Sequence, residues 1–302
     1  MHRRDHWARR SERLDPVRDS HEISLHVSAY DFPWDNLQAL SFALFRTYAV
    51  PTIGRLLDET QEFTGRVQKR YDDTGLLLEE VQRHGLGSTR GRSAVRRINQ
   101  MHAMYDISND DFRYVLATFV VVPKRWIDDF GFRRLSPNEL EAITNYYLEL
   151  GRHMAIKDLP SDFAGFERLL DDYEREHFAF DPGGRRVADS TLDLMTTFPP
   201  NSFAPAWLVK RFAFSLMDEP LLRAFHYPVP SRLERAFFLG AMKVRARLLR
   251  FFPARSEPKW VSAYGYYRTY PAGYEIDHLG TFPGGAGCPF HARATEPDEA
   301  VS

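Results

Sequence analysis

Three serines in this sequence, Ser108, Ser136 and Ser231, are each followed three positions later by an aspartate or a glutamate. In this arrangement the serine side chain caps the first backbone N–H groups of a helix, and the acidic residue lies in the first turn. Apolar residues recur at helical spacing after each motif, whereas alternating strand patterns are nearly absent. The sequence therefore predicts an all-α fold.

The same signals divide the chain into three parts. Residues 31–255 are expected to form a single large domain of about ten helices. Residues 1–30 are polar and rich in arginine, which favours an extended or partly disordered arm. Residues 256–302 are rich in Gly, Pro and Tyr, and we expect an irregular tail on the surface. No period of 20–50 residues recurs, which argues against a solenoid.

Several helix boundaries follow from local signals. Pro51 is expected to separate two helices, and Thr74 is a candidate cap for a helix that ends near Gly85. Pro123 should end the helix that starts after Ser108. The DPGG segment at 181–184 is expected to be a loop.

The overall charge argues against one class of partner. Forty basic and forty-one acidic side chains leave a formal net charge of -1, which gives no electrostatic basis for binding nucleic acid. The single cysteine, Cys288, excludes an internal disulfide framework and fits a reducing compartment. Because no secretory signal and no run of about 18 apolar residues occurs, we expect a cytoplasmic protein without a transmembrane span. Peripheral membrane contact and the oligomeric state stay open.

The segment INQMHAMYDISNDDF, residues 98–112, carries the most informative histidine. On a helix, the face of His102 also holds Val95, Ile98 and Tyr105, so the imidazole points into apolar surroundings. One interpretation is a core histidine bonded to a backbone carbonyl. The other is a metal or haem ligand, because neutral imidazole binds iron well and apolar walls suit a porphyrin.

Charged residues upstream and beside this segment allow two readings as well. Arg70 and Thr74 are one helical turn apart, so they could share a face and offer a cation and a hydroxyl group to an oxygen species or a carboxylate. They could equally be a cap with solvated charges. Basic residues including Arg96 and Arg97 flank His102; they form a solvated face or pair with haem propionates.

Two other arrangements are weaker candidates. Glu174 and His177 have the Glu-x-x-His spacing of di-iron proteins, but the second copy, at Glu275–His278, lies in a Gly- and Pro-rich segment rather than a predicted helix. Cys288 could bind haem through its thiolate, or be a thiol without a role in the tail.

The order of these motifs resembles the MpaB-type oxygenase family, which is related to the rubber oxygenase known as latex clearing protein. The resemblance spans about residues 35–280 and rests on KRYDDT, on RRINQMHAMYDISNDDFRYVLATFVVVPKRW at 96–126, and on GFRRLSPNELEA, LGRHMAIKDLP and YPAGYEIDHLG. Residues 96–126 are its most specific part.

The resemblance implies an all-helical protein that binds one haem b, with molecular oxygen as co-substrate. It maps the proximal iron ligand onto His102, and an Arg-x-x-x-Thr element near the haem onto Arg70 and Thr74. Latex clearing proteins have a lysine just before the threonine, where this chain has Asp73, so the distal ligand does not transfer. The expected function is a haem-dependent oxygenase of a hydrophobic substrate, such as an isoprenoid or another olefin.

Three other functions are compatible with the same residues. A haem peroxygenase or monooxygenase of lipid or aromatic substrates would use the same site. A non-catalytic haem sensor or carrier would bind haem without turnover. A helical interaction protein would have His102 as a core residue only.

Overall fold

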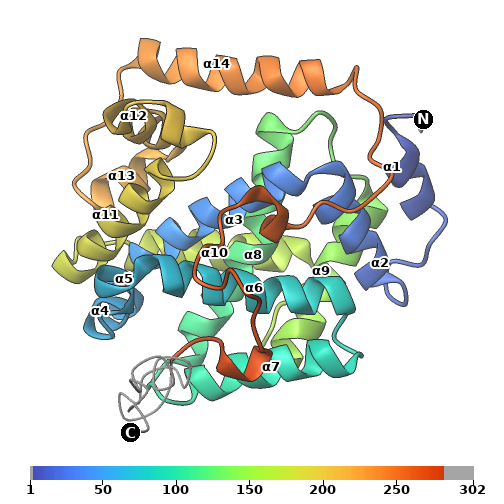
Figure 1. The fold of residues 1–302 in the computed structure, drawn as a ribbon, viewed down its shortest axis with the longest axis horizontal. Helices are drawn as coiled ribbons and strands as arrows, with labels where there is room; N and C mark the ends of the chain where they lie inside the picture. Colours follow the sequence, from blue (N-terminus) through green and yellow to red (C-terminus); the bar gives the residue numbers. More distant parts are fainter. Residues whose placement is uncertain (1–2, 282–302) are drawn as a thin grey trace, which may run out of the picture.

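The computed structural model describes residues 3–281, and this part of the chain is all-α, as predicted (Figure 1). Fourteen α-helices lie within it, and four of these have six residues or fewer. The α-helices are α1 (His6–Ser11), α2 (Ser20–Leu25), α3 (Pro33–Tyr48), α4 (Pro51–Glu59), α5 (Glu62–Gly65), α6 (Val67–His84), α7 (Thr89–His102), α8 (Asn109–Phe130), α9 (Pro137–His153), α10 (Phe163–His177), α11 (Pro182–Thr196), α12 (Ala206–Leu216), α13 (Glu219–Ala224) and α14 (Arg232–Leu249).

The three serine caps lie where the sequence placed them. Each side chain of Ser108, Ser136 and Ser231 accepts a hydrogen bond from the backbone N–H three positions later, at the start of α8, α9 and α14. At Ser136 the Glu139 carboxylate also accepts from the Ser136 N–H at 2.9 Å, which completes a capping box. Pro51 separates α3 from α4, as expected.

Helix α8 is the central element of the fold, and it packs against α3, α9 and α10. The prediction that Pro123 ends this helix is wrong, because α8 continues to Phe130. Pro123 removes one backbone hydrogen bond. Burial of Val121, Trp126 and Ile127 on either side of it holds the helix together regardless.

The prediction of an extended arm over residues 1–30 is also wrong for its described part. Helices α1 and α2 lie there, and a π-helical turn at His26–Asp31 follows α2. Trp7, Ile23 and Val27 are buried, and α2 packs against α9. A few apolar residues spread among many charges are thus sufficient to dock this segment on the body.

Helices α4 and α11 cross at a pair of glycines. A Cβ atom on Gly54 would lie 2.7 Å from the Cα of Gly184, and one on Gly184 would lie 2.4 Å from the carbonyl oxygen of Tyr48. The DPGG segment is not a loop, because its aspartate, Asp181, caps α11 by accepting from the N–H groups of Gly183 and Gly184 at 2.8 and 3.1 Å. Gly54 and Gly184 therefore allow α4 and α11 to pack closely against each other.

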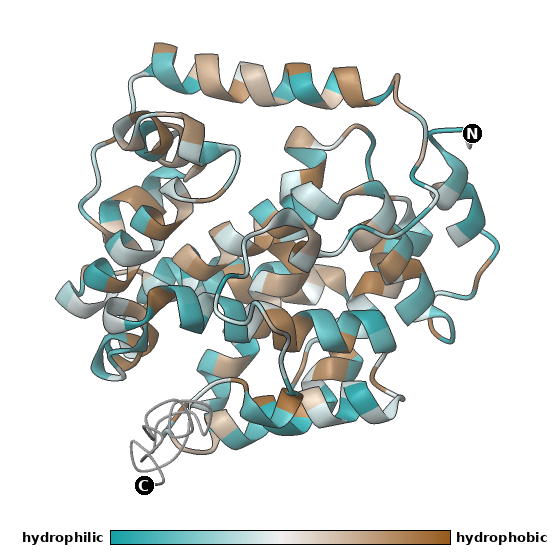
Figure 2. Cartoon of the chain, in the orientation of Figure 1, coloured by the Kyte–Doolittle hydropathy of each residue, from teal (hydrophilic) through white to brown (hydrophobic). Residues whose placement is uncertain are grey.

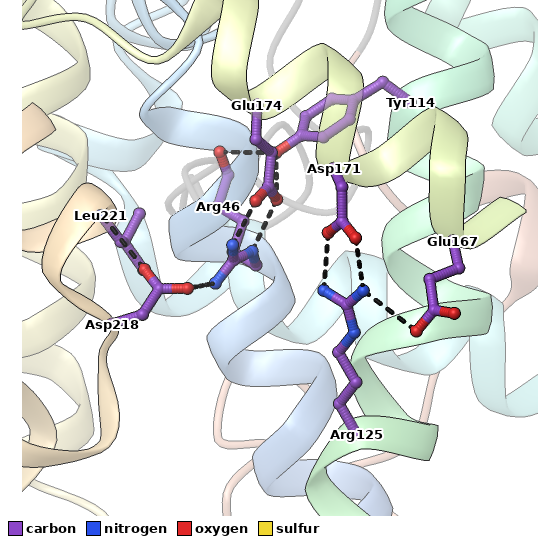
Figure 3. A network of polar contacts seen from close by, with 8 residues as sticks. All are labelled: Arg46, Tyr114, Arg125, Glu167, Asp171, Glu174, Asp218 and Leu221. Atoms are coloured by element: carbon purple, nitrogen blue, oxygen red, sulfur yellow. Dashed lines mark hydrogen bonds and ion pairs between the residues drawn. The ribbon is translucent and has the colours of Figure 1, made fainter.

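A partly buried network of ion pairs and hydrogen bonds joins α3 to three other helices (Figure 3). Arg46 of α3 forms ion pairs with Glu174 of α10 and with Asp218, the cap of α13. The Tyr114 hydroxyl of α8 donates to the Arg46 carbonyl oxygen at 3.0 Å. A second arginine in Figure 3, Arg125, forms a more exposed ion pair with α10.

The segment after α14 is irregular but not confined to the surface. It has two short 3-10 helices, at Val261–Tyr264 and Ile276–His278, and the side chains of Tyr266 and Leu279 are buried. Cys288 lies outside the described residues. None of the described helices combines the length and hydrophobicity that a bilayer-spanning segment needs.

Candidate functional site

Arg70 and Thr74 lie in the first half of α6, which begins at Val67. Thr74 is therefore not a helix cap. The charged residues before it are helical because they form pairs one turn apart, such as Lys69 with Asp73, whose Nζ and Oδ2 atoms are 2.6 Å apart. The Arg70 guanidinium donates to the Thr74 hydroxyl, which in turn donates to the Arg70 carbonyl oxygen at 2.9 Å. The two side chains thus form one polar unit.

His102 is the last residue of α7, in a position that seals one ring nitrogen from water. Its ring meets the Phe112 ring edge-on, with centroids 5.3 Å apart. The Nδ1 atom is buried and has no hydrogen-bond partner among the described residues. Burial and the nearby Arg70 guanidinium lower the pKa of His102 to about 4. The imidazole is therefore neutral at physiological pH, with a lone pair available for a metal.

The structure brings the two sequence-predicted groups together. Arg70 is near enough to His102 to depress its pKa, although 32 positions separate them in the chain. Helices α6 and α7 pack against each other, which places the first half of α6 near the end of α7. The Arg70 guanidinium carbon lies 5.2 Å from the centre of the Phe63 ring. A cation, a hydroxyl group and a neutral imidazole thus meet among aromatic side chains.

Sequence reasoning did not find two further polar groups near Arg70. Tyr48 of α3 is fully buried, and its hydroxyl faces Thr191 of α11 without a hydrogen bond of normal geometry. Burial raises the pKa of Tyr48, and the Thr191 hydroxyl and the Arg70 guanidinium oppose this rise. No local signal could have identified this pair, because only the crossing of α4 and α11 sets α11 against the end of α3.

Arg96 and Arg97 differ in their surroundings. Arg96 is exposed. Arg97 is buried, and its guanidinium donates to the carbonyl oxygens of Leu279 and Thr281, both at 2.7 Å. One of the two expected propionate partners therefore fastens the C-terminal segment to α7.

The two aspartates of KRYDDT also contact the C-terminal segment. Asp72 accepts from the backbone N–H groups of Arg268 and Thr269 at 2.9 and 2.8 Å. Asp73, which stands where latex clearing proteins have a lysine, is buried between Lys69 and the Tyr270 hydroxyl. The two aspartates of this motif are thus committed to the C-terminal segment, whereas Arg70 lies near His102.

The di-iron arrangement has no counterpart in the described residues, where no group of three or more His, Cys, Asp or Glu side chains could hold a metal ion. Glu174 is engaged by Arg46, and the His177 Nδ1 atom lies 3.0 Å from the Tyr173 carbonyl oxygen. The Cys288 alternative lies outside the described residues.

The remaining arrangement fits a haem iron, which needs one axial protein ligand rather than a cluster. His102 offers a neutral imidazole with an unpaired buried nitrogen, and the Phe112 ring packs against it. Arg70 adds a fixed positive charge and N–H donors that could stabilise oxygen atoms bearing negative charge.

Comparison with known proteins finds one matching family and several relatives. The family model described as "ER-bound oxygenase mpaB/B'/Rubber oxygenase, catalytic domain" matches residues 36–247. The chain is 33% identical over 247 residues to the ER-bound oxygenase mpaB' of Penicillium brevicompactum, covering 76% of this chain and 58% of that protein. It is 31% identical over 229 residues to the mpaB protein of the same fungus, covering 70% of this chain and 58% of that protein. The chain thus spans somewhat over half the length of these two relatives.

Proposed function

This chain belongs to the family of mpaB-type and rubber oxygenases, and on that basis we propose that it is a haem b-dependent oxygenase that uses molecular oxygen on a hydrophobic substrate. The observation that carries the proposal is the neutral imidazole of His102, with a buried, unpaired Nδ1 atom, beside the Arg70 guanidinium.

In this proposal His102 is the proximal ligand of the haem iron. An imidazole must be unprotonated to bind iron, and a pKa of about 4 keeps it so over the whole physiological range. A core histidine would normally have its buried ring nitrogen bonded to a carbonyl or hydroxyl oxygen, and none is available to Nδ1 among the described residues. Haem would supply the binding of oxygen and the redox chemistry that no side chain provides.

Arg70 and Thr74 would stabilise the negative charge that develops on oxygen atoms during the reaction. The hydrogen bonds between Arg70 and Thr74 hold both groups in place on α6, so little reorganisation is needed when charge appears. Arg96 is exposed and is therefore the arginine that could pair with a haem propionate, since Arg97 is already bonded to the C-terminal segment.

The substrate we propose is an alkene such as an isoprenoid chain. The Phe63 ring lies beside Arg70 and the Phe112 ring beside His102, and such apolar neighbours favour an apolar molecule. The family description also includes rubber oxygenase, an enzyme named for its action on rubber. Cleavage of the double bond gives each carbon one atom of molecular oxygen, so two carbonyl groups form and no external reductant is consumed.

The absorbance spectrum of the purified protein tests the cofactor. We expect a Soret band that shifts when carbon monoxide is added to the reduced protein. His102→Ala should lose this spectrum or the haem itself. The matched control is His153→Ala, because His153 is an exposed histidine at the end of α9. Full haem content and an unchanged spectrum in His102→Ala would show that another residue is the ligand.

Product analysis with an isoprenoid alkene tests the reaction. Two carbonyl products, each with one atom of labelled dioxygen, would support cleavage. One alcohol would indicate a monooxygenase or peroxygenase. A haem protein that turns over none of the alkenes would be a sensor or carrier, and a protein that takes up no haem would contradict the proposal.

A further inference from the structure

Helix α14 lies with its apolar side toward solvent. Leu233, Phe237, Val244, Leu248 and Phe251, the last just beyond the helix, have exposed fractions between 51% and 85%. Their spacings of four, seven, four and three residues place them in one stripe along the helix, which we call the apolar stripe of α14. The helix forms one edge of the molecule (Figure 1), and apolar residues recur along it (Figure 2).

The opposite side of α14 is held to the body by apolar and polar contacts: Leu239 and Met242 pack on the hydrophobic core, and the Phe238 ring meets the Phe212 ring edge-on. The Arg245 guanidinium forms an ion pair with buried Asp35 at 2.8 Å, and Arg235 donates to the Met217 carbonyl oxygen at 2.7 Å. Only two side chains of the helix, Met242 and Ala246, are buried. A surface helix normally turns its apolar face inward. Here large apolar side chains lie on the outer side of the helix as well, and an exposed apolar stripe of this kind marks an interaction surface.

The charges beside the stripe have one sign. Arg232, Lys243 and Arg247 are exposed, and no ion pair involves them among the described residues. Lys243 and Arg247 are one turn apart and flank the stripe. The single acidic residue of α14, Glu234, is paired with Arg211. The exposed face therefore combines large apolar side chains with positive charge that is not balanced.

We propose that α14 docks this protein on the surface of an anionic lipid bilayer, with the apolar stripe at the boundary of headgroups and acyl chains. Apolar burial and attraction of basic side chains to anionic lipids together hold such helices at a membrane surface. A second copy of the chain is a poorer match, because its α14 would bring the same cations and no free carboxylate. This proposal concerns membrane binding only, so it does not depend on the proposed oxygenase reaction.

Vesicle flotation of the full-length protein tests this proposal. Vesicles of phosphatidylcholine alone are compared with vesicles that also contain phosphatidylserine. We expect binding to the anionic vesicles that weakens as salt rises. The double variant Lys243→Gln/Arg247→Gln should bind these vesicles about 30-fold more weakly, as expected for two lost cations near the surface. The double variant Phe237→Ser/Leu248→Ser should lose on the order of 100-fold.

A charge-matched control is Arg152→Gln/Arg168→Gln, which removes two exposed arginines from α9 and α10 and should bind like the parent protein. The proposal is overturned if the parent protein does not bind anionic vesicles, or if the control loses as much binding as the α14 variants. It is also overturned if Phe237→Ser/Leu248→Ser converts a dimer to a monomer in sedimentation while vesicle binding is unchanged, because a second copy would then cover the stripe.

Discussion

Replacing Asp72 by alanine should destabilise the protein strongly, although the Asp72 carboxylate forms no ion pair in the described part of the chain. Asp72 is fully buried on α6, and its carboxylate accepts four hydrogen bonds. The donors are the Gln68 amide at 2.6 Å, the Arg268 and Thr269 N–H groups at 2.9 and 2.8 Å, and the Thr269 hydroxyl at 2.6 Å.

The magnitude follows from the donors that would be left behind. Each buried donor without a partner costs about 1–3 kcal/mol, and the costs of neighbouring donors are not additive. Water can reach part of the site once the carboxylate is gone, so we expect Asp72→Ala to lose about 3–5 kcal/mol of the free energy of unfolding. This loss is a large share of the roughly 5–15 kcal/mol that stabilises a typical domain.

Urea unfolding followed by circular dichroism measures this loss, and limited proteolysis reports whether the C-terminal segment is released first. Asp129→Ala is the control, because Asp129 is an exposed aspartate of α8 and its removal should change stability by less than about 0.5 kcal/mol. A loss below about 1 kcal/mol in Asp72→Ala, or cleavage of the 256–281 segment no faster than in the parent, would refute the reasoning.

Three further outcomes are expected. Burial lowers the pKa of His26 to about 4, below its unfolded value, so the stability it contributes is complete above pH 6.5 and falls as the pH drops toward 4. His26→Gln should therefore remove about 2 kcal/mol of the acid-induced loss at pH 5, as measured by urea unfolding at several pH values. Gly184→Ala should lower the melting temperature because its Cβ meets the Tyr48 carbonyl, whereas Gly240→Ala on α14 meets nothing and should be neutral or stabilising by up to about 1 kcal/mol. Arg46→Met should lower the free energy of unfolding by about 3–5 kcal/mol, because it leaves the buried Glu174 carboxylate without its cation. Arg125→Met, at a more exposed ion pair, should lower it by less than about 1 kcal/mol. Equal losses in the two variants, measured by denaturant unfolding, would contradict this account of burial.

Local capping signals predicted helix starts well. The side chains of Ser108, Ser136 and Ser231 cap helices because the motif needs only residues within one turn of each other. Capping failed at Thr74, and the loop predicted from the Gly- and Pro-rich segment after Asp181 was wrong as well. At Thr74, pairs one turn apart extend α6 upstream; at Asp181, the following glycines are helical because another helix packs on them.

Composition was a poor guide at both ends of the domain. Charged residues dominate the first thirty positions, yet the buried ring of Trp7 and its neighbours fix helices there. The segment after α14 is irregular, but carboxylates of α6 hold it against the body. A segment with few apolar residues can still pack firmly on the domain when buried polar groups of the domain bind it.

The sequence by itself determined the all-α class and the helix starts that have a serine cap, and it predicted His102, Arg70 and Thr74 as site residues, because periodicity, caps and motif order are properties of short stretches. Tertiary structure decided which of them meet. Packing of α6 against α7 brings Arg70 to His102, and it turns Asp72 and Asp73 toward the C-terminal segment. It also decided that the apolar stripe of α14, flanked by Lys243 and Arg247, stays in solvent while Arg245 on the opposite side reaches the body, since a helical pattern defines two faces and only the rest of the fold selects which one is covered.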